Sequence, residues 1–351
     1  MKLDSESKTP LPKSGDLSQM KNPHEKDQKC ADAALPHAMK FSERSIKANK
    51  LPINPESYQT SASPRGRFPS WLHRNLPKGA NLFKTNAILS KYRLNTVCEE
   101  AKCPNRFECY SNRTATFLAL GKECTRNCGF CDIDFSKTPK LPEEDEPLRI
   151  AGSVRELGLQ HVVITMVARD DLSDKGANHI AAIIRTIRNE CHGVSIEVLT
   201  SDFSGDQTSL GIVLKEKPDV FNHNLETVRE LTPRVRHKAT YERTLSVLRY
   251  VKNSGLAGYI KSGIMVGLGE TPSQVKETIS DLHLTGCDIM TIGQYLQPDR
   301  RKLLVKEFVT PAQFKLYEEY GYSIGIRQMY CGPFVRSSYN AHEVKNLTQK
   351  N

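Results

Sequence analysis

The sequence predicts an α/β protein built on a parallel β-sheet. From residue 116 onward, short apolar segments alternate with amphipathic helical segments, the pattern of parallel strands joined by crossover helices. With 351 residues, the chain is long enough for two domains or for one large barrel-type domain with appendages. Its hydrophobic content is 38%, and no apolar run approaches the roughly 18 residues of a membrane span. Collagen-like, membrane-spanning and wholly disordered classes are therefore excluded.

Six strand-then-helix units are predicted, counting the first strand at residues 117–120. The further strands are expected at 161–167, 195–199, 219–222, 259–266 and 288–292, and the helices at 178–189, 209–215, 241–252, 272–284 and 311–321. Six units are too few for a closed eight-unit barrel, so we expect an open partial barrel or a doubly wound sheet. In both architectures ligands bind at the carboxyl ends of the strands.

The chain is expected to divide into four parts. Residues 1–65 are rich in Lys, Ser, Pro, Asn and Gln and predict a disordered or loosely ordered extension. From Arg67 the composition changes, and residues 66–115, with a short helix at 85–92, are predicted to form a cap. The barrel is expected at 116–325 and a C-terminal tail at 326–351.

The N-terminus predicts a protein of a reducing, cytoplasmic compartment. It offers no apolar stretch for a secretory signal, and its acidic residues, without any Arg before Arg44, argue against a transit peptide. Ten cysteines are too few for a disulfide scaffold of this size, yet six of them lie between Cys98 and Cys131. This clustering points to metal binding.

The downstream triad is Cys124, Cys128 and Cys131, a C-x3-C-x2-C spacing just past the first predicted strand. A zinc ion would need a fourth ligand at finger-like spacing, which the sequence does not offer. Soft thiolates also suit a [4Fe-4S] cluster, and three of them leave one iron open to a ligand.

Residues 124–131, with Phe130 as the aromatic residue before the last cysteine, resemble the signature of the radical S-adenosylmethionine (SAM) superfamily. The resemblance implies that the open iron chelates the amino and carboxylate groups of SAM, and that the fold is a partial, six-unit TIM-like barrel. Residues 263–270 resemble the G-x-I-x-G-x-x-E segment of that superfamily, with Met265 in place of Ile. This likeness places Gly267 at the cofactor, although a strand closed by a glycine turn explains the segment equally well.

The upstream triad is Cys98, Cys103 and Cys109, a C-x4-C-x5-C spacing that predicts a second cluster. The two triads in succession resemble the lipoyl synthase family. Segments at 166–172, 222–227 and 336–339 agree with that family, and the resemblance spans about residues 67–343.

Polar residues after two strands are expected to bind SAM: Arg169 and Asp170 after the second, and Asn222, Asn224 and Glu226 after the fourth. Each has an alternative interpretation: Arg169 and Asp170 as a salt-bridged helix entrance, Asn222 and Asn224 as turn formers, and Glu226 as a solvated charge.

No chemistry is assigned to His223, interpreted as a satisfied polar residue, or to the isolated Cys30, Cys191, Cys287 and Cys331.

The resemblance also gives a role in cluster binding to the tail segment Arg336-Ser337-Ser338-Tyr339. It implies that Ser338 is the fourth ligand of the auxiliary cluster held by the upstream triad, with Ser337 as the fallback. A serine must lose its proton to bind iron, and its oxygen is a harder ligand than a thiolate, so this bond is expected to be the weakest of the cluster.

The implied reaction inserts sulfur at C6 and C8 of a protein-bound octanoyl-lysine. It uses two SAM molecules as radical sources and an auxiliary cluster that is sacrificed as the sulfur source. The cap and the tail are expected to cover the barrel mouth. The implied partners are octanoylated carrier domains (2-oxoacid dehydrogenase E2 subunits and the glycine cleavage H protein), a ferredoxin or flavodoxin, and an iron-sulfur carrier, with no nucleic acid and no membrane. The net charge of +10 suits an acidic carrier domain.

Two other functions compete with this interpretation. Another sulfur-inserting radical enzyme, such as a biotin-synthase-like protein, shares the downstream triad but is not expected to carry the upstream one. An iron-sulfur scaffold or redox sensor would use clustered cysteines, but it would need neither six strand-helix units nor the 263–270 segment.

Overall fold

The structure is a computed structural model, and it describes residues 68–73 and 81–338. The chain divides into two compact units, residues 1–59 and 60–351, and all described residues belong to the second. The predicted extension at 1–65 and the end of the predicted tail lie outside the described residues.

A seven-stranded parallel sheet organises the second unit, with the strands in chain order β1-β4-β5-β6-β7-β8-β9. The strands are β1 (Thr116–Ala119), β4 (His161–Met166), β5 (Ser195–Leu199), β6 (Val220–Asn222), β7 (Tyr259–Val266), β8 (Ile289–Gln294) and β9 (Gln328–Gly332). Within the described part of the chain, no pairing joins β1 to β9, so the barrel is open.

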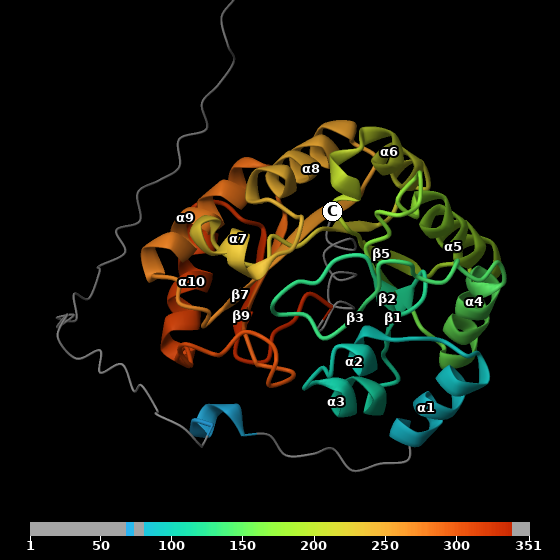
Figure 1. Ribbon diagram of the computed structural model, residues 1–351, viewed down its shortest axis with the longest axis horizontal. Helices are drawn as coiled ribbons and strands as arrows, with labels where there is room; N and C mark the ends of the chain where they lie inside the picture. The colour runs from blue at the N-terminus through green and yellow to red at the C-terminus, as the bar shows by residue number, and fades with distance from the viewer. Residues whose placement is uncertain (1–67, 74–80, 339–351) are drawn as a thin grey trace, which may run out of the picture. The chain divides into compact units, whose positions relative to one another are not determined.

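Six helices connect successive strands and cover the outer face of the sheet, as the arc in Figure 1 shows. They are α4 (Glu146–Leu157), α5 (Ala177–Glu190), α6 (Gln207–Lys215), α8 (Tyr241–Ser254), α9 (Pro272–Leu284) and α10 (Pro311–Ser323). The prediction of an α/β partial barrel with six strand-helix units is confirmed. The assignment of every residue after 325 to a tail needs correction, because β9 pairs with β8. This short edge strand is only partly buried and lacks the apolar run by which the other strands are recognised.

Local signals explain where these helices begin and end. Thr271 caps α9 through a capping box with Gln274, and the Thr240 and Thr310 side chains cap α8 and α10. Gly158 and Gly255 end α4 and α8 in the left-handed conformation, which glycine adopts without a steric penalty.

A helical layer lies beside β1, at the open side of the sheet (Figure 1). The short helix η2 (Ser70–Leu72) lies apart from this layer, near α10 (Figure 1), and the Phe68 ring just before it packs edge-on against Phe308. The layer contains α1 (Asn81–Lys91), α2 (Val97–Glu100) and α3 (Arg106–Ser111). The fully buried Tyr110 joins it internally: its hydroxyl lies 2.7 Å from Thr96 Oγ1, and its carbonyl accepts a 2.8 Å bond from Thr85 Oγ1. Thr96 also forms an antiparallel bridge to Phe117, which docks the layer on the edge strand.

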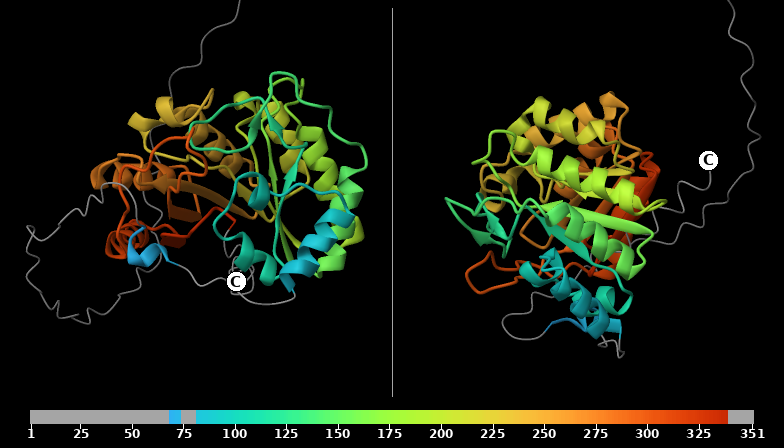
Figure 2. Two further views of the ribbon diagram at one scale, coloured as in Figure 1. Left: turned by 60° about the horizontal axis from the view of Figure 1, so that its bottom comes forward. Right: turned by 90° about the vertical axis from the view of Figure 1, so that its right-hand side faces the viewer.

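Short strands and helices lie at the carboxyl ends of the sheet strands. They are the pair β2 (Glu123–Cys124) and β3 (Asp134–Phe135), η3 (Phe203–Gly205), η4 (Arg229–Leu231) and α7 (Thr232–Val235). The right-hand view of Figure 2 shows β2 and β3 projecting from this end of the sheet. Among the described residues, no helix has both the length and the apolar character needed to cross a bilayer.

Candidate cluster and cofactor site

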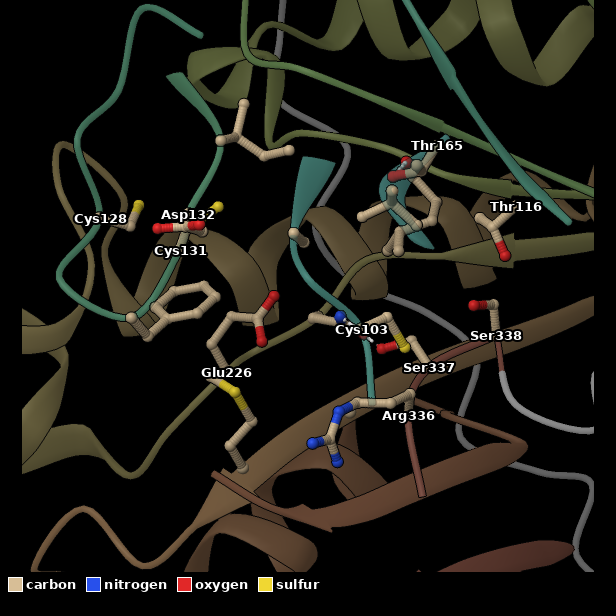
Figure 3. Close-up of a pocket in the computed structure, with 18 of the residues that line it drawn as sticks. Cys103, Thr116, Cys128, Cys131, Asp132, Thr165, Glu226, Arg336, Ser337 and Ser338 are labelled. Atoms are coloured by element: carbon tan, nitrogen blue, oxygen red, sulfur yellow. Dashed lines mark hydrogen bonds between the residues drawn. The ribbon is translucent and has the colours of Figure 1, made fainter. Parts of the chain in front are cut away.

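One cavity of about 530 Å³ lies at the carboxyl ends of the strands, and its wall includes all six clustered cysteines. In Figure 3, Cys128 and Cys131 of the downstream triad lie on one side of the cavity. Cys103 of the upstream triad lies on the other side, near Ser337 and Ser338, with Glu226 between the two groups. Residues from the helical layer, the barrel strands and the chain end therefore meet in one space.

The loop that carries the downstream triad is fixed by its backbone. The Arg126 N–H donates to Cys124 Sγ at 3.3 Å, and the His237 N–H donates to Cys128 Sγ at 3.4 Å. The Gly129 N–H donates to the Val235 carbonyl at 2.9 Å. Such N–H donors favour the thiolate form of cysteine, the form that binds iron.

Burial disfavours the thiolate form at three of the six cysteines. Burial raises the pKa of Cys131 and of Cys98 to about 12, and it also raises the pKa of Cys128. An iron centre at these positions supplies the positive charge that favours thiolates, and a bound metal deprotonates its thiol ligands. The site thus suits a cationic metal centre.

Arg126, inside the downstream loop, binds two carboxylates. It donates to both oxygens of Asp170 at 2.9 and 2.8 Å and lies 2.6 Å from Asp202. These ion pairs hold the pKa of Asp170 and of Asp202 below the usual range against the opposing effect of burial. They join the cluster loop to the ends of β4 and β5.

Four predicted cofactor contacts lie outside the cavity wall. Arg169 is buried and binds Asp171 through two hydrogen bonds of 2.9 and 2.8 Å. Asp170 is held by Arg126, Asn222 donates to Glu197 Oε1 at 2.9 Å, and the Gly267 N–H donates to the Glu270 carboxylate. Their contact with SAM stays a prediction.

Three predicted contacts, Phe130, Asn224 and Glu226, do line the cavity. The Glu226 carboxylate points into it (Figure 3), and burial raises the pKa of this group although Arg236 opposes the rise. Asn224 Oδ1 is buried without a hydrogen-bond partner among the described residues. A buried polar atom without a partner is costly, so this oxygen fits a ligand that donates a hydrogen bond.

Sequence reasoning missed Thr200, whose buried Oγ1 also lacks a partner among the described residues while the residue lines the cavity. It follows β5 directly, so its place at a strand end could have revealed it. The role of Arg126 was also missed, because its partners are 44 and 76 positions away along the chain.

The upstream triad is joined to the chain end. The Asn105 side chain, between Cys103 and Cys109, donates to the Phe334 carbonyl at 2.7 Å. Ser337 Oγ accepts a 2.6 Å hydrogen bond from Asn224 Nδ2. Ser338 lines the same cavity, and Figure 3 shows its hydroxyl on the side of Thr116, the residue that hydrogen-bonds Cys98. The second serine therefore lies on the side of the upstream triad.

Among residues 68–73 and 81–338, no three His, Cys, Asp or Glu side chains are placed to hold one metal ion. The sulfur donors at the cavity wall are cysteine thiols, the ligand type of iron-sulfur clusters. In a [4Fe-4S] cluster each thiolate binds a different iron, so its ligands lie farther apart than those of a zinc ion. The cysteine triads and the unpartnered polar atoms at the wall thus fit clusters and a polar cofactor.

The residues without assigned chemistry have the following surroundings, and His223 is also part of the cavity wall. His223 is buried, with its ring nitrogens 2.9 Å from the Thr200 carbonyl and 3.2 Å from Thr244 Oγ1. Cys191 and Cys287 are buried in the core, and Cys331 packs against it. Cys30 lies outside the described residues.

Two family profiles match the chain. The radical SAM superfamily matches residues 118–282, and the N-terminal domain of lipoyl synthase matches residues 16–103. Family-like sequence therefore begins at residue 16, so the expected start near residue 67 is wrong. The missed stretch carries no cysteine motif by which it could be recognised.

Two relatives show the family of the chain. The lipoyl synthase of Protochlamydia amoebophila is 61% identical over 308 residues, which covers 87% of this chain and 95% of that protein. The lipoyl synthase of Chlamydia felis is 50% identical and covers 86% of this chain and 97% of its own length. The Streptococcus suis SuiB structure aligns with a TM-score of 0.49 at 13% identity, over 75% of this chain and 55% of that one. Sequence identity this high over nearly the full length of both relatives shows that the chain belongs to the lipoyl synthase family of the radical SAM superfamily.

Proposed function

We propose that the chain is a lipoyl synthase, a sulfurtransferase that inserts two sulfur atoms, at C6 and C8, into a protein-bound octanoyl-lysine. The observation that supports this most is the single cavity lined by both cysteine triads. When bound, SAM and two [4Fe-4S] clusters, one of them consumed, would supply hydrogen-atom abstraction from unactivated carbons and the inserted sulfur, with one SAM for each sulfur.

The cysteines and one serine hold these groups in the proposed site. Cys124, Cys128 and Cys131 bind the cluster that receives SAM, while Cys98, Cys103, Cys109 and Ser338 bind the auxiliary cluster. The position of Ser338 on the side of the upstream triad supports this division. The backbone N–H groups of Arg126 and His237 stabilise two of the thiolates.

Cavity-lining polar side chains bind SAM in this proposal. Asn224 Oδ1 accepts a hydrogen bond, Thr200 contributes its hydroxyl, and Glu226 faces the polar end of the ligand. Phe130 packs beside it in the wall. The buried arginines Arg169 and Arg126, paired with Asp171 and Asp170, position the loops that carry these contacts.

The remaining wall suits an acyl chain. Apolar side chains from the helical layer and the strand ends contribute to it, among them Val97, Leu118, Ile133 and Leu199. In the proposed arrangement, the helical layer and residues 333–338, which follow β9, close the mouth of the barrel. The Asn105–Phe334 hydrogen bond ties cap to tail, and a closed cavity protects reactive groups from water.

The proposed partners are octanoylated carrier domains, of E2 and H-protein type, together with a ferredoxin or flavodoxin and an iron-sulfur carrier that restores the spent cluster. The chain is proposed to act in the cytoplasm without nucleic acid or membrane partners. Its formal charge of +10 supports an acidic protein partner.

Product formation after anaerobic reconstitution tests the function. With dithionite and SAM, we expect 5′-deoxyadenosine, and an octanoyl-lysyl peptide should stimulate its formation and become sulfurated. Absence of 5′-deoxyadenosine would point to an iron-sulfur scaffold or sensor. Its formation without any response to the peptide would point to another radical enzyme.

A further inference from the structure

The downstream loop borders a second pocket, which we call the outer pocket, besides the main cavity. It measures about 350 Å³, and its wall includes Gly129 together with two carboxylates and two cations, Asp132, Asp134, Arg301 and Lys302. Cys128 lines both this pocket and the main cavity. One cluster cysteine is therefore reachable from outside without passage through the space proposed for substrate.

Two chain segments frame this outer pocket and are tied to the loop by backbone hydrogen bonds. On one side, Gly129 N–H donates to the Val235 carbonyl at 2.9 Å, and Asn127 N–H donates to His237 Nδ1 at 3.0 Å. On the other side, Leu303 N–H donates to the Gly129 carbonyl at 2.9 Å. Both segments therefore hold fixed positions relative to Cys128.

These segments are rich in basic residues, most of which are exposed, whereas Lys302 is half-buried. Nearby carboxylates balance only part of this charge: Asp132 lies 2.7 Å from Lys102, Asp299 lies 2.8 Å from Arg301, and Asp134 is exposed. We call the cationic residues of the two segments the basic rim: Arg234, Lys238, Arg300, Arg301 and Lys302.

We propose that the basic rim is the docking surface for a small, acidic one-electron carrier protein. The inference rests on the proposed function, which requires one electron from outside for each SAM cleaved. The carrier's reduced group loses one electron, which enters the cluster held by the downstream triad across Cys128, and no bond forms or breaks in this step. Opposite charges speed and orient such encounters between proteins.

The same surface suits an acidic lipoyl-carrier domain less well. The acyl-lysine arm of that domain must enter the main cavity, which both triads line, whereas the outer pocket is lined by Cys128 and by no cysteine of the upstream triad. An electron carrier needs only a close approach to Cys128. The position of the pocket therefore selects the electron carrier over the substrate domain.

A charge-reversal pair tests the surface with an acidic flavodoxin as the probe. In the reconstituted full chain, Arg234→Glu/Arg300→Glu should weaken flavodoxin binding about tenfold or more, measured by calorimetry at low salt, because both reversals repel an acidic partner. Stopped-flow reduction of the bound cluster by flavodoxin hydroquinone should slow in parallel, while reduction by dithionite should stay at the wild-type rate.

The matched control is Arg249→Glu/Lys315→Glu, which changes the net charge equally at exposed positions on α8 and α10. It should bind flavodoxin like the wild type. Equal weakening in both pairs, or wild-type binding by the rim pair, would overturn the proposal. Selective loss of octanoylated carrier-domain binding by the rim pair would overturn it too. The dithionite assay with octanoyl peptide tests the proposed function separately, since it uses no carrier protein.

Discussion

At the scale of single residues, the two adjacent serines have different surroundings. Ser337 Oγ is held by Asn224 Nδ2 at 2.6 Å, so it belongs to the wall proposed for SAM. Ser338 lies on the side of Thr116, and Cys103 of the upstream triad lies near both serines (Figure 3). Because Asn224 already engages Ser337 Oγ, we propose Ser338 as the oxygen ligand of the auxiliary cluster.

Replacement of that ligand tests its role. We expect Ser338→Cys to keep the wild-type iron content. Its rate of lipoyl product formation should be at most about one tenth of the wild-type rate, because a thiolate binds iron more firmly than a hard oxygen ligand does. Iron analysis and mass spectrometry of an octanoyl peptide measure the two quantities, with Ser337→Cys as the neighbouring control. A wild-type rate in Ser338→Cys would contradict the weak-ligand hypothesis.

His223 predicts a pH dependence of stability. Burial, together with the charge of Arg236, lowers its pKa from 6.5 to about 4, so the ring stays neutral in the fold while it gains a proton in the unfolded chain below 6.5. Stability from this residue is therefore complete above about pH 6.5 and decreases by about 3 kcal/mol as the pH falls to about 4.

Urea unfolding of the metal-free chain at pH 7 and pH 4.5, with His223→Asn for comparison, measures this contribution. The wild type should lose more stability than the variant between these two pH values. Equal losses in both proteins would show that His223 does not titrate as proposed.

At the scale of elements, an ion pair joins the two cluster loops. Lys102, next to Cys103, lies 2.7 Å from the largely buried Asp132, next to Cys131. Salt bridges of exposed lysines add little stability, but this one fixes one triad relative to the other. The cysteine spacing indicates two cluster sites from the sequence alone. The Lys102–Asp132 ion pair could not be predicted, because it depends on how the helical layer docks on β1.

Loss of that ion pair should uncouple 5′-deoxyadenosine formation from sulfur insertion. We expect Lys102→Met to form 5′-deoxyadenosine within about twofold of the wild type, and its yield of lipoyl product per 5′-deoxyadenosine should fall several-fold, because misplaced groups react poorly. Chromatographic quantification of both products gives the ratio. Lys102→Arg should retain the wild-type ratio, and an unchanged ratio in Lys102→Met would exclude a positioning role.

At the scale of the whole molecule, three distant segments build the site: the helical layer, the barrel loops and the chain end. The fold class and six strand-helix units were predictable, because hydrophobic periodicity is a local property. The strand β9 was not predictable, because an edge strand is only partly covered and therefore needs no continuous apolar run. Among the predicted SAM contacts, position after a strand located Asn224 and Glu226 in the cavity wall, but Arg169 and Asp170 are engaged in ion pairs that sequence alone does not reveal.

The two-cluster proposal predicts the metal content of the whole chain. Reconstituted protein should contain about eight iron atoms and as many labile sulfides, and Cys103→Ala should retain about four with undiminished SAM cleavage but no sulfur insertion. Colorimetric iron and sulfide assays decide this. About four iron atoms in the wild type would refute the two-cluster mechanism.

The sequence by itself determined the two cysteine triads, the alternation of strands and helices, and the family, because each depends on residues close together in the chain. Only the tertiary structure decided that both triads share one cavity, that Arg126 binds Asp170 and Asp202, and that Cys128 also lines a second pocket. These features depend on contacts between segments distant in sequence. Such contacts form only when the sheet brings the carboxyl ends of its strands to one edge.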